Sequence, residues 1–376
     1  MSRTRQTVGS SAKLTGVRGR SGSGSDVDRL SALPDCLLHA VLSFLESRQA
    51  VRTSVLSKRW TDLWRSMPCI DVDRRATRSP GGDSDGRKFR NFVDNLLLFH
   101  DDAPVLDTFR LHLDLGGSRT AIIGKDESDR WIRRGVKYCP SVLEIDLGSN
   151  CDGVRLPSLG SCSHRLKRLY LSDVSLDASF AQQVHFGCPV LEDLELKSCE
   201  CAFLGITSHT LKILTLDGCF TNLKDALLII TAPALTSFHL AVSGEEYRAG
   251  ISVNEAANLV QVSMCVHENY RGSYFQKNLR KLLDGLSSAR NLQLKNVQTM
   301  EPIDEKSEKF PSFSNLRTLF LYRCDISDNF QTVQHFLQNA PNLEKLLLQY
   351  CVLHEGSKKR KTKEKPKRIS LRLQRR

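Results

Sequence analysis

The stretch LEDLELKSC, residues 191–199, carries the pattern on which the fold of this chain depends. Leucines stand at its first, fourth and sixth positions, and a cysteine stands at its ninth. Alternation of apolar and polar residues is typical of a strand with one buried face, because successive side chains of a strand point to opposite sides. The stretch therefore predicts a short strand that buries its leucines.

The same pattern, L-x-x-L-x-L with apolar substitutes, recurs along most of the chain. Seven of the nine intervals between successive starts lie within the roughly 20–29 residues of leucine-rich repeats. A single repeat cannot bury its apolar side alone, so neighbouring coils must stack into a curved solenoid. The starts are Leu106, Val142, Leu166, Leu191, Leu211, Leu235, Leu259, Ala289, Leu316 and Leu343.

Three further regularities support the repeats. Eight residues after a start stands an asparagine or cysteine, as in the leucine-rich consensus, and two residues before several starts stands a proline. Apolar residues spaced by three and four predict helices in the intervals, at residues 89–100, 129–139, 275–286 and 330–340. The consensus positions are Asn150, Cys199, Cys219, Cys324 and Cys351, and the prolines are Pro104, Pro140, Pro189, Pro233 and Pro341. We predict an α/β fold in which residues 89–353 form a leucine-rich-repeat solenoid, or horseshoe.

A different segment precedes the repeats: LPDCLLHAVLSFLESRQAVRTSVLSKRWTDLW, residues 33–64. It holds two apolar stripes at helical spacing, one from Leu37 to Leu45 and one from Val51 to Trp64. A unit below about 40 residues rarely stabilises itself. Its apolar surface therefore needs a cover, which is either the solenoid or another protein.

This segment resembles a plant-type F-box. Its LP, LL, SFL, SVLSKRW and LW elements follow the family order, and the tandem with leucine-rich coils resembles the plant F-box/leucine-rich-repeat family. We expect a small N-terminal α-helical F-box at residues 26–73 and a polar, Gly/Pro-rich linker at residues 74–88.

The resemblance implies a substrate-recognition subunit of a Skp–cullin–F-box (SCF) E3 ubiquitin ligase. The F-box would bind a Skp-type adaptor, and through it a cullin–RING ligase, while the repeats bind a protein substrate of unknown identity for ubiquitination. The chain itself would not be an enzyme. Matching positions give an adaptor-contacting or adaptor-supporting set: Leu33, Pro34, Leu37, Leu38, Val41, Phe44, Leu45, Val55, Leu56 and Trp60.

Two other interpretations stay open. Residues 33–64 also suit a helical cap on the first coil, although a cap should run straight into that coil rather than through a linker. The chain would then be a leucine-rich-repeat scaffold that binds a partner without a ubiquitin-ligase role.

Substrate contacts are expected on the concave face, where residues between the inward leucines are displayed. Tyrosine and phenylalanine are common at interface hot spots, but strands also favour them on solvated faces. The candidates are Tyr170, Asp193, Glu195, Thr215, His239, Phe320 and Tyr322.

Charge is concentrated at the two ends. Of the net charge of +12, residues 1–25 carry +5 and residues 358–376 carry +10, which leaves −3 for the rest. We expect basic tails that are disordered, at residues 1–25 and 354–376. Nucleic-acid binding by the fold is not expected, because the fold has no excess positive charge.

The C-terminal run KKRKTKEKPKR fits a nuclear-import signal, a tail that contacts nucleic acid, or a solvated tail with no partner. We expect the chain in the nucleus, the cytoplasm or both. The import residues would be Lys358, Lys359, Arg360 and Lys361.

Other classes of function lack a motif. The sequence has no G-x-S-x-G, no G-x-x-x-x-G-K-[ST] and no H-E-x-x-H, and Cys199-x-Cys201 lacks a second ligand pair. We therefore expect no catalytic residue, cofactor or metal. No apolar run is long enough for a membrane helix, and no signal peptide is evident, so the twelve cysteines are expected to be reduced.

Overall fold

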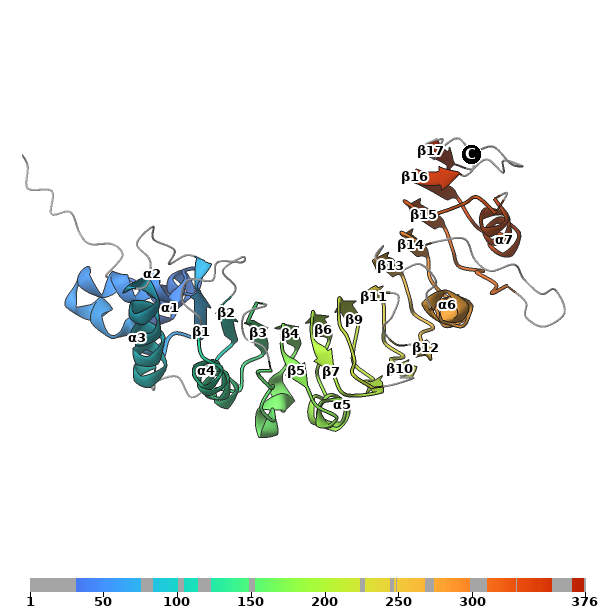
Figure 1. The fold of residues 1–376 in the computed structure, drawn as a ribbon. Coiled ribbons are helices and arrows are strands. Elements are labelled where there is room, and N and C mark those ends of the chain that lie inside the picture. Colours follow the sequence, from blue (N-terminus) through green and yellow to red (C-terminus); the bar gives the residue numbers. More distant parts are fainter. Residues whose placement is uncertain are drawn as a thin grey trace, which may run out of the picture.

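A computed structural model describes the protein at residues 32–75, 84–100, 105–113, 123–148, 153–223, 227–243, 247, 249–267, 274–297, 310–328, 330–353 and 367–374. The N-terminal tail and residues 358–361 lie outside these ranges. Figure 1 shows a small helical unit at the blue end, followed by a curved sheet whose helices lie along its outer side.

The helices of the described residues differ widely in length. They are α1 (Asp35–Leu42), α2 (Ser47–Arg52), α3 (Ser84–Phe99), α4 (Lys125–Lys137), α5 (Ser179–Gln182), α6 (Tyr274–Gly285) and α7 (Gln331–Asn339). The four helices predicted between repeats correspond to α3, α4, α6 and α7, within a few residues at each end. Their amphipathic spacing is thus confirmed as the outer layer of the solenoid.

One long sheet forms the inner layer. Its twelve strands run in the order β1-β2-β3-β4-β6-β9-β11-β13-β14-β15-β16-β17, and all pairs up to β16 are parallel. The strands are β1 (Cys69–Asp73), β2 (Thr108–His112), β3 (Val142–Asp146), β4 (Arg168–Ser172), β6 (Asp193–Lys197), β9 (Ile213–Asp217), β11 (Ser237–Ser243), β13 (Gln261–His267), β14 (Asn291–Lys295), β15 (Thr318–Tyr322), β16 (Lys345–Leu353) and β17 (Lys367–Gln374).

Alternation along these strands separates the core from the concave face. Leu169 of β4 pairs with Leu194 of β6, and Leu214 of β9 follows in the same row; all three are fully buried. Tyr170, Glu195 and Thr215, which alternate with the buried leucines, are half-buried on the other face. Buried ladders of this kind join all coils into one apolar core, as the repeat pattern predicted.

Several strands end in the same turn, and this turn explains the consensus cysteine. Ser198, Gly218 and Arg323 each adopt a left-handed backbone directly after a strand. The next residue is a buried cysteine whose thiol donates a hydrogen bond to a leucine carbonyl of the preceding coil, as Cys199 does to Leu171 at 3.4 Å and Cys219 does to Leu196 at 3.3 Å. The cysteine therefore fills a narrow buried position and satisfies a carbonyl there.

The outer layer changes character in the middle coils. Small strands replace helices: β12-β10-β8 form a parallel three-stranded sheet and β5-β7 a pair. α5 continues into a short π-helix at Gln183–Gly187. These strands are β5 (Ser175–Leu176), β7 (Glu200–Cys201), β8 (Gly205–Thr207), β10 (Leu227–Thr231) and β12 (Gly250–Asn254).

The sheet begins earlier than predicted. β1 lies within the predicted F-box, residues 26–73, yet it pairs with β2 in parallel from Cys69 to Asp73 and is the first strand of the sheet. Its Ile70 and Val72 are buried in the solenoid core. The predicted linker also ends early, because α3 starts at Ser84.

The repeat frame at β3 was wrong by two residues. Leu143 pairs with Leu169 and Ile145 with Leu171, so the coil starts at Pro140 rather than Val142. Val142 lies on the half-buried concave side. The error arose because V-L-E-I-D-L fits the pattern in either frame, since strands repeat every two residues.

The C-terminal tail is not entirely disordered, which corrects the prediction for residues 354–376. β17 runs antiparallel to β16 and pairs Leu346 with Leu373 and Leu348 with Leu371. Alternating Ile369, Leu371 and Leu373 pair with Cys351, Leu348 and Leu346 and continue their apolar side, on which Leu371 and Leu373 are exposed.

Candidate functional site

The N-terminal unit has a small core of its own. Leu38 and Leu42 of α1 pack against residues from the following turns, and all six members of this cluster are buried. Leu33 and Leu45, both half-buried, pack against it. The cluster consists of Leu38, Leu42, Ala50, Trp60, Leu63 and Met67.

The second predicted helical stripe is not one helix. α2 ends at Arg52, and 3-10 turns follow at Thr53–Val55, Lys58–Thr61 and Leu63–Ser66. Ser57 has an extended backbone, which separates the first two of these 3-10 turns.

The N-terminal unit presents large apolar side chains to solvent, both from α1 and from the turns that follow. Phe44 is 89 % exposed and Val55 is 86 % exposed, and Leu37, Val41 and Leu56 are exposed as well. Pro34 is also exposed, at the start of α1. Apolar area left in water costs free energy, so these side chains form an incomplete hydrophobic surface.

Two members of the predicted adaptor set have the burial expected of a supporting residue rather than of a direct contact. Leu38 is 0 % exposed and Trp60 is buried, so neither reaches the surface of this unit. They support the exposed residues from below, which was the other role predicted for the set. Hence the structure divides the ten residues into an exposed group and a supporting group.

Polar contacts hold the N-terminal unit together and join it to the solenoid. Arg59 binds Asp35 in an ion pair of 2.5 Å, which holds the second 3-10 turn against α1. The Asp71 backbone N–H donates to the Ser47 hydroxyl at 2.8 Å, and the His100 ring lies 3.0 Å from the Met67 carbonyl oxygen. Trp64 packs against both cores.

The concave face brings together four of the predicted substrate residues. Tyr170, Glu195, Thr215 and His239 pair in one row across β4, β6, β9 and β11. Asp193 lies in the neighbouring row, where it binds Arg168 at 3.0 Å.

The row extends toward the N-terminus beyond the predicted residues. Asp71, Arg110 and Glu144 occupy the same register on β1, β2 and β3. Arg110 contacts Glu144 at 2.8 Å and Asp71 at 3.7 Å. The sequence signal for Arg110 and Glu144 is the repeat itself, because each stands between two inward apolar residues of its strand.

Carboxylates crowd this N-terminal half of the face. Burial raises the pKa of Asp71, and burial together with the nearby Asp193 carboxylate raises the pKa of Glu195. Burial, followed by the charge of Asp146, raises the pKa of Tyr170 to about 12. The neighbouring carboxylates add to the effect of burial on Tyr170 and Glu195, while Lys197 acts in the opposite direction on Glu195.

Phe320 of β15 lies further along the same row, after Ser263 of β13 and Gln293 of β14, and Tyr322 lies two residues beyond it on β15. Their ring centroids are 6.1 Å apart, and Tyr322 contacts Tyr350 edge to face at 5.8 Å. The Arg323 guanidinium lies 5.3 Å from the Tyr322 ring centroid. The C-terminal half thus offers aromatic rather than acidic groups, which suits an apolar anchor of a partner.

The described cysteines are scattered through the fold or stacked in the strand-end turns. In the described part of the chain, no three His, Cys, Asp or Glu side chains come together in a way that could hold a metal ion. Nine described cysteines are free thiols, and burial raises the pKa of Cys324 to about 12, which keeps it a protonated donor. Cys139 is disulfide-bonded, contrary to the expectation that all thiols are reduced.

No helix among the described residues combines the length and apolar composition needed to cross a bilayer.

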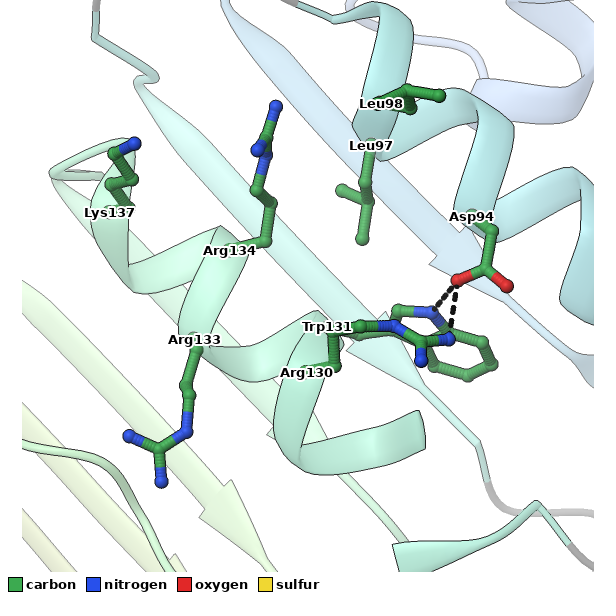
Figure 2. Close-up of a pocket in the computed structure, with 8 residues that line it drawn as sticks. All are labelled: Asp94, Leu97, Leu98, Arg130, Trp131, Arg133, Arg134 and Lys137. Atoms are coloured by element: carbon green, nitrogen blue, oxygen red, sulfur yellow. Dashed lines mark hydrogen bonds and ion pairs between the residues drawn. The ribbon is translucent and has the colours of Figure 1, made fainter. Parts of the chain in front are cut away.

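A groove of about 550 Å³ lies between α3 and α4, on the outer side of the first coils (Figure 2).

Comparison with known proteins identifies the class. A sequence model of the F-box domain matches residues 30–71, and a model described as "FBD-associated F-box protein At5g56370, LRR repeats" matches residues 132–278. The chain therefore combines an F-box with leucine-rich repeats, which is the composition of an F-box substrate adaptor.

Relatives that match most of the chain have F-box names as well. "MEIOTIC F-BOX protein MOF" of Oryza sativa subsp. japonica is 35 % identical, over 91 % of this chain and 76 % of that protein. The Arabidopsis thaliana "Putative F-box/LRR-repeat protein At3g58880" is 28 % identical, over 87 % of this chain and 78 % of the relative. The chain belongs to the plant F-box/leucine-rich-repeat family, whose members are in general non-catalytic adaptors.

Proposed function

We propose that this protein is the substrate-recognition subunit of a Skp–cullin–F-box ubiquitin ligase. The observation that carries the proposal is the incomplete apolar surface of the N-terminal unit, around Phe44 and Val55. It lies on a unit with its own buried core, so the surface is preformed for a second polypeptide. A Skp-type adaptor is the partner that the F-box implies.

The proposed mechanism is proximity. The F-box fixes one end of the chain on the ligase, and the curved sheet holds a substrate on its concave face. Confining the substrate near a ubiquitin carrier raises its effective concentration there, so transfer becomes in effect intramolecular. The chain supplies position and no catalytic residue.

Affinity purification of the full chain tests this proposal. We expect a Skp-type adaptor and a cullin to be recovered with it, and the cullin to be lost when the adaptor is depleted. Recovery of neither protein would refute the proposal. Recovery of other partners without adaptor or cullin would instead favour the scaffold function.

The substrate surface needs a separate experiment. Proximity labelling from the full chain, with and without proteasome inhibition, should reveal proteins that accumulate only when degradation is blocked. A labelled set that does not respond to inhibition would argue against degradation of the bound substrate.

The basic C-terminal run is proposed to direct nuclear import. Deleting the whole tail would also remove β17, so the test replaces Lys358, Lys359, Arg360 and Lys361 by alanine. We expect a fluorescent fusion of this variant to shift from the nucleus to the cytoplasm. An unchanged distribution would exclude import by this run.

A further inference from the structure

The long sheet ends on a strand that is paired on one side only. Among the strands that the structure describes, β17 is the last in the sheet order, and its one partner is β16 (Figure 1). An edge strand presents a row of backbone N–H and C=O groups, so another extended segment can pair with it. The side chains of β17 then decide which segment fits.

One side of β17 is apolar and exposed. Leu371 is 44 % exposed and Leu373 is 51 % exposed, although their partners on β16, Leu348 and Leu346, are buried. Leu373 also lines an open groove of about 270 Å³, together with the exposed Leu337 of α7. The apolar layer of the solenoid therefore continues past its last parallel strand to an end that water reaches.

The other side of β17 is basic. Arg368 and Arg372 alternate with the leucines and are exposed, and neither makes an ion pair with a residue that the structure describes. β16 contributes one further basic residue and β17 another, while neither strand contains an acidic one. Glu344 lines the groove but is already paired with Arg317 at 2.7 Å. The charge of the two arginines is thus not balanced within the described part of the chain.

Basic side chains on an edge strand also have a protective role, because like charges discourage two copies from pairing edge to edge. In a twofold pair of β17 strands, directly opposite residues would lie on the same side of the sheet. Arg368 and Arg372 of one copy would then share a side with those of the other. This protection accounts for the arginines and argues against a second copy, but it does not account for the exposed leucines.

We propose that β17 is extended by a strand of a partner protein in which acidic and apolar residues alternate. Its backbone would pair with the free edge, its carboxylates would lie beside Arg368 and Arg372, and its apolar side chains would cover the leucines and enter the groove. Side chains directly opposite each other on paired strands are about 5 Å apart, so opposite charges interact there. A nucleic acid would meet the arginines but leave the leucines in water.

This edge lies at the opposite end of the sheet from β1 and from the N-terminal unit. The inference goes beyond the proposed ligase function and does not rest on it, because it follows from the β16–β17 pair and the groove beside it. The incoming strand could belong to a substrate or to a regulator, and either would use the same chemistry.

Binding of synthetic peptides to the full-length protein tests the inference. The probe is a short peptide in which glutamate and valine alternate. Matched peptides replace glutamate by lysine, replace valine by serine, break the alternation with the same composition, or methylate the backbone N–H groups. We expect the alternating acidic peptide to bind more tightly than each of the others by about fivefold or more. If it does not bind, or binds no better than the reordered or methylated peptide, the inference is overturned.

Charge reversal locates the peptide on β17. Arg368→Glu with Arg372→Glu should weaken binding of the acidic peptide by about tenfold or more and should create binding of the lysine peptide. Lys167→Glu with Lys281→Glu makes the same change in net charge at exposed positions of other coils and should leave both affinities unchanged. The gain for the lysine peptide distinguishes a reversed contact from a strand that no longer folds. Loss without that gain, or an equal effect of the control, would contradict the assignment to β17.

Two further measurements address the other occupants. Sedimentation of the protein alone tests a second copy, and a single-stranded DNA oligonucleotide tests a nucleic acid. We expect a monomer, and DNA binding weaker than that of the acidic peptide. A dimer that the peptide dissociates, or DNA that binds more tightly than the peptide and is lost on reversal of Arg368 and Arg372, would overturn the inference in favour of that occupant.

Discussion

The N-terminal unit and the concave face of the solenoid expose opposite chemistry within one chain. The first leaves Phe44 and Val55 in solvent above a small apolar core, whereas the second presents half-buried rows of charged, polar and aromatic groups. Burial of apolar area gives affinity that depends little on the orientation of the contacting groups. Polar groups discriminate between partners, because a wrong partner leaves a buried donor or acceptor without a hydrogen bond. The difference suits one constant partner at the first surface and a selected partner at the second.

The largest predicted effect compares two neighbouring leucines of α1. Leu38 is fully buried and Leu37 is 50 % exposed. Leu38→Asp places a carboxylate in the small core and should destabilise the unit by about 3 kcal/mol or more. Leu37→Asp should leave stability almost unchanged but reduce adaptor binding.

Chemical denaturation and hydrogen exchange of α1 would measure this difference. Equal destabilisation by both substitutions would mean that Leu37 is part of the core in solution. The division between exposed and supporting residues would then be wrong.

A second prediction asks whether the two surfaces are independent. Phe320→Ser with Tyr322→Ser removes the aromatic pair on β15 and should weaken capture of an anchored substrate by about 2 kcal/mol, the usual size of a hot spot. Proximity labelling should therefore lose proteins that the wild type labels. Adaptor binding should persist, and its loss would show that the surfaces are coupled.

The smallest predicted effect is a pH dependence. The pKa of Glu195 is raised above its ordinary value of 4.5, chiefly by burial, so the folded state binds its proton more tightly than the unfolded state does. The protonated form is favoured by folding, and stability is lost as pH rises from below 4.5 through the raised pKa.

Glu195→Gln should accordingly raise the melting temperature slightly at pH 7 and leave it almost unchanged below the ordinary pKa. Parallel melting curves at neutral and acidic pH would measure the difference. A variant that is less stable at pH 7 would show that the carboxylate makes a favourable contact instead.

Much of the solenoid could be predicted because every coil obeys the same constraint. Leu191, Leu194 and Leu196 are all buried, as the L-x-x-L-x-L pattern of their coil predicts, and stacking repeats this arrangement in the other coils. The first coil was not predicted although Met67, Ile70 and Val72 follow the same spacing, because the resemblance placed these residues in the F-box. The alternation in β17 was likewise hidden by the surrounding positive charge.

The sites were less predictable, since they depend on which elements meet. Tyr170 and Glu195 could be placed on one face from the repeat register, but their crowding by Asp146 and Asp193 appears only when strands pair. The α3–α4 groove has an even weaker signal. Arg130, Arg134 and Lys137 share one face of a helix, yet no pattern indicates that Leu98 of another helix lies beside them.

The most direct test of the central claim is the affinity of a Skp-type adaptor for the exposed apolar surface. Calorimetric titration would compare wild-type protein with Phe44→Asp combined with Val55→Asp. Phe186→Asp serves as the matched control, because Phe186 is 77 % exposed on a distant coil. We expect the double variant to lose about a hundredfold or more in affinity and the control to bind like the wild type. Unaltered binding by the double variant would contradict the claim that the adaptor completes this surface.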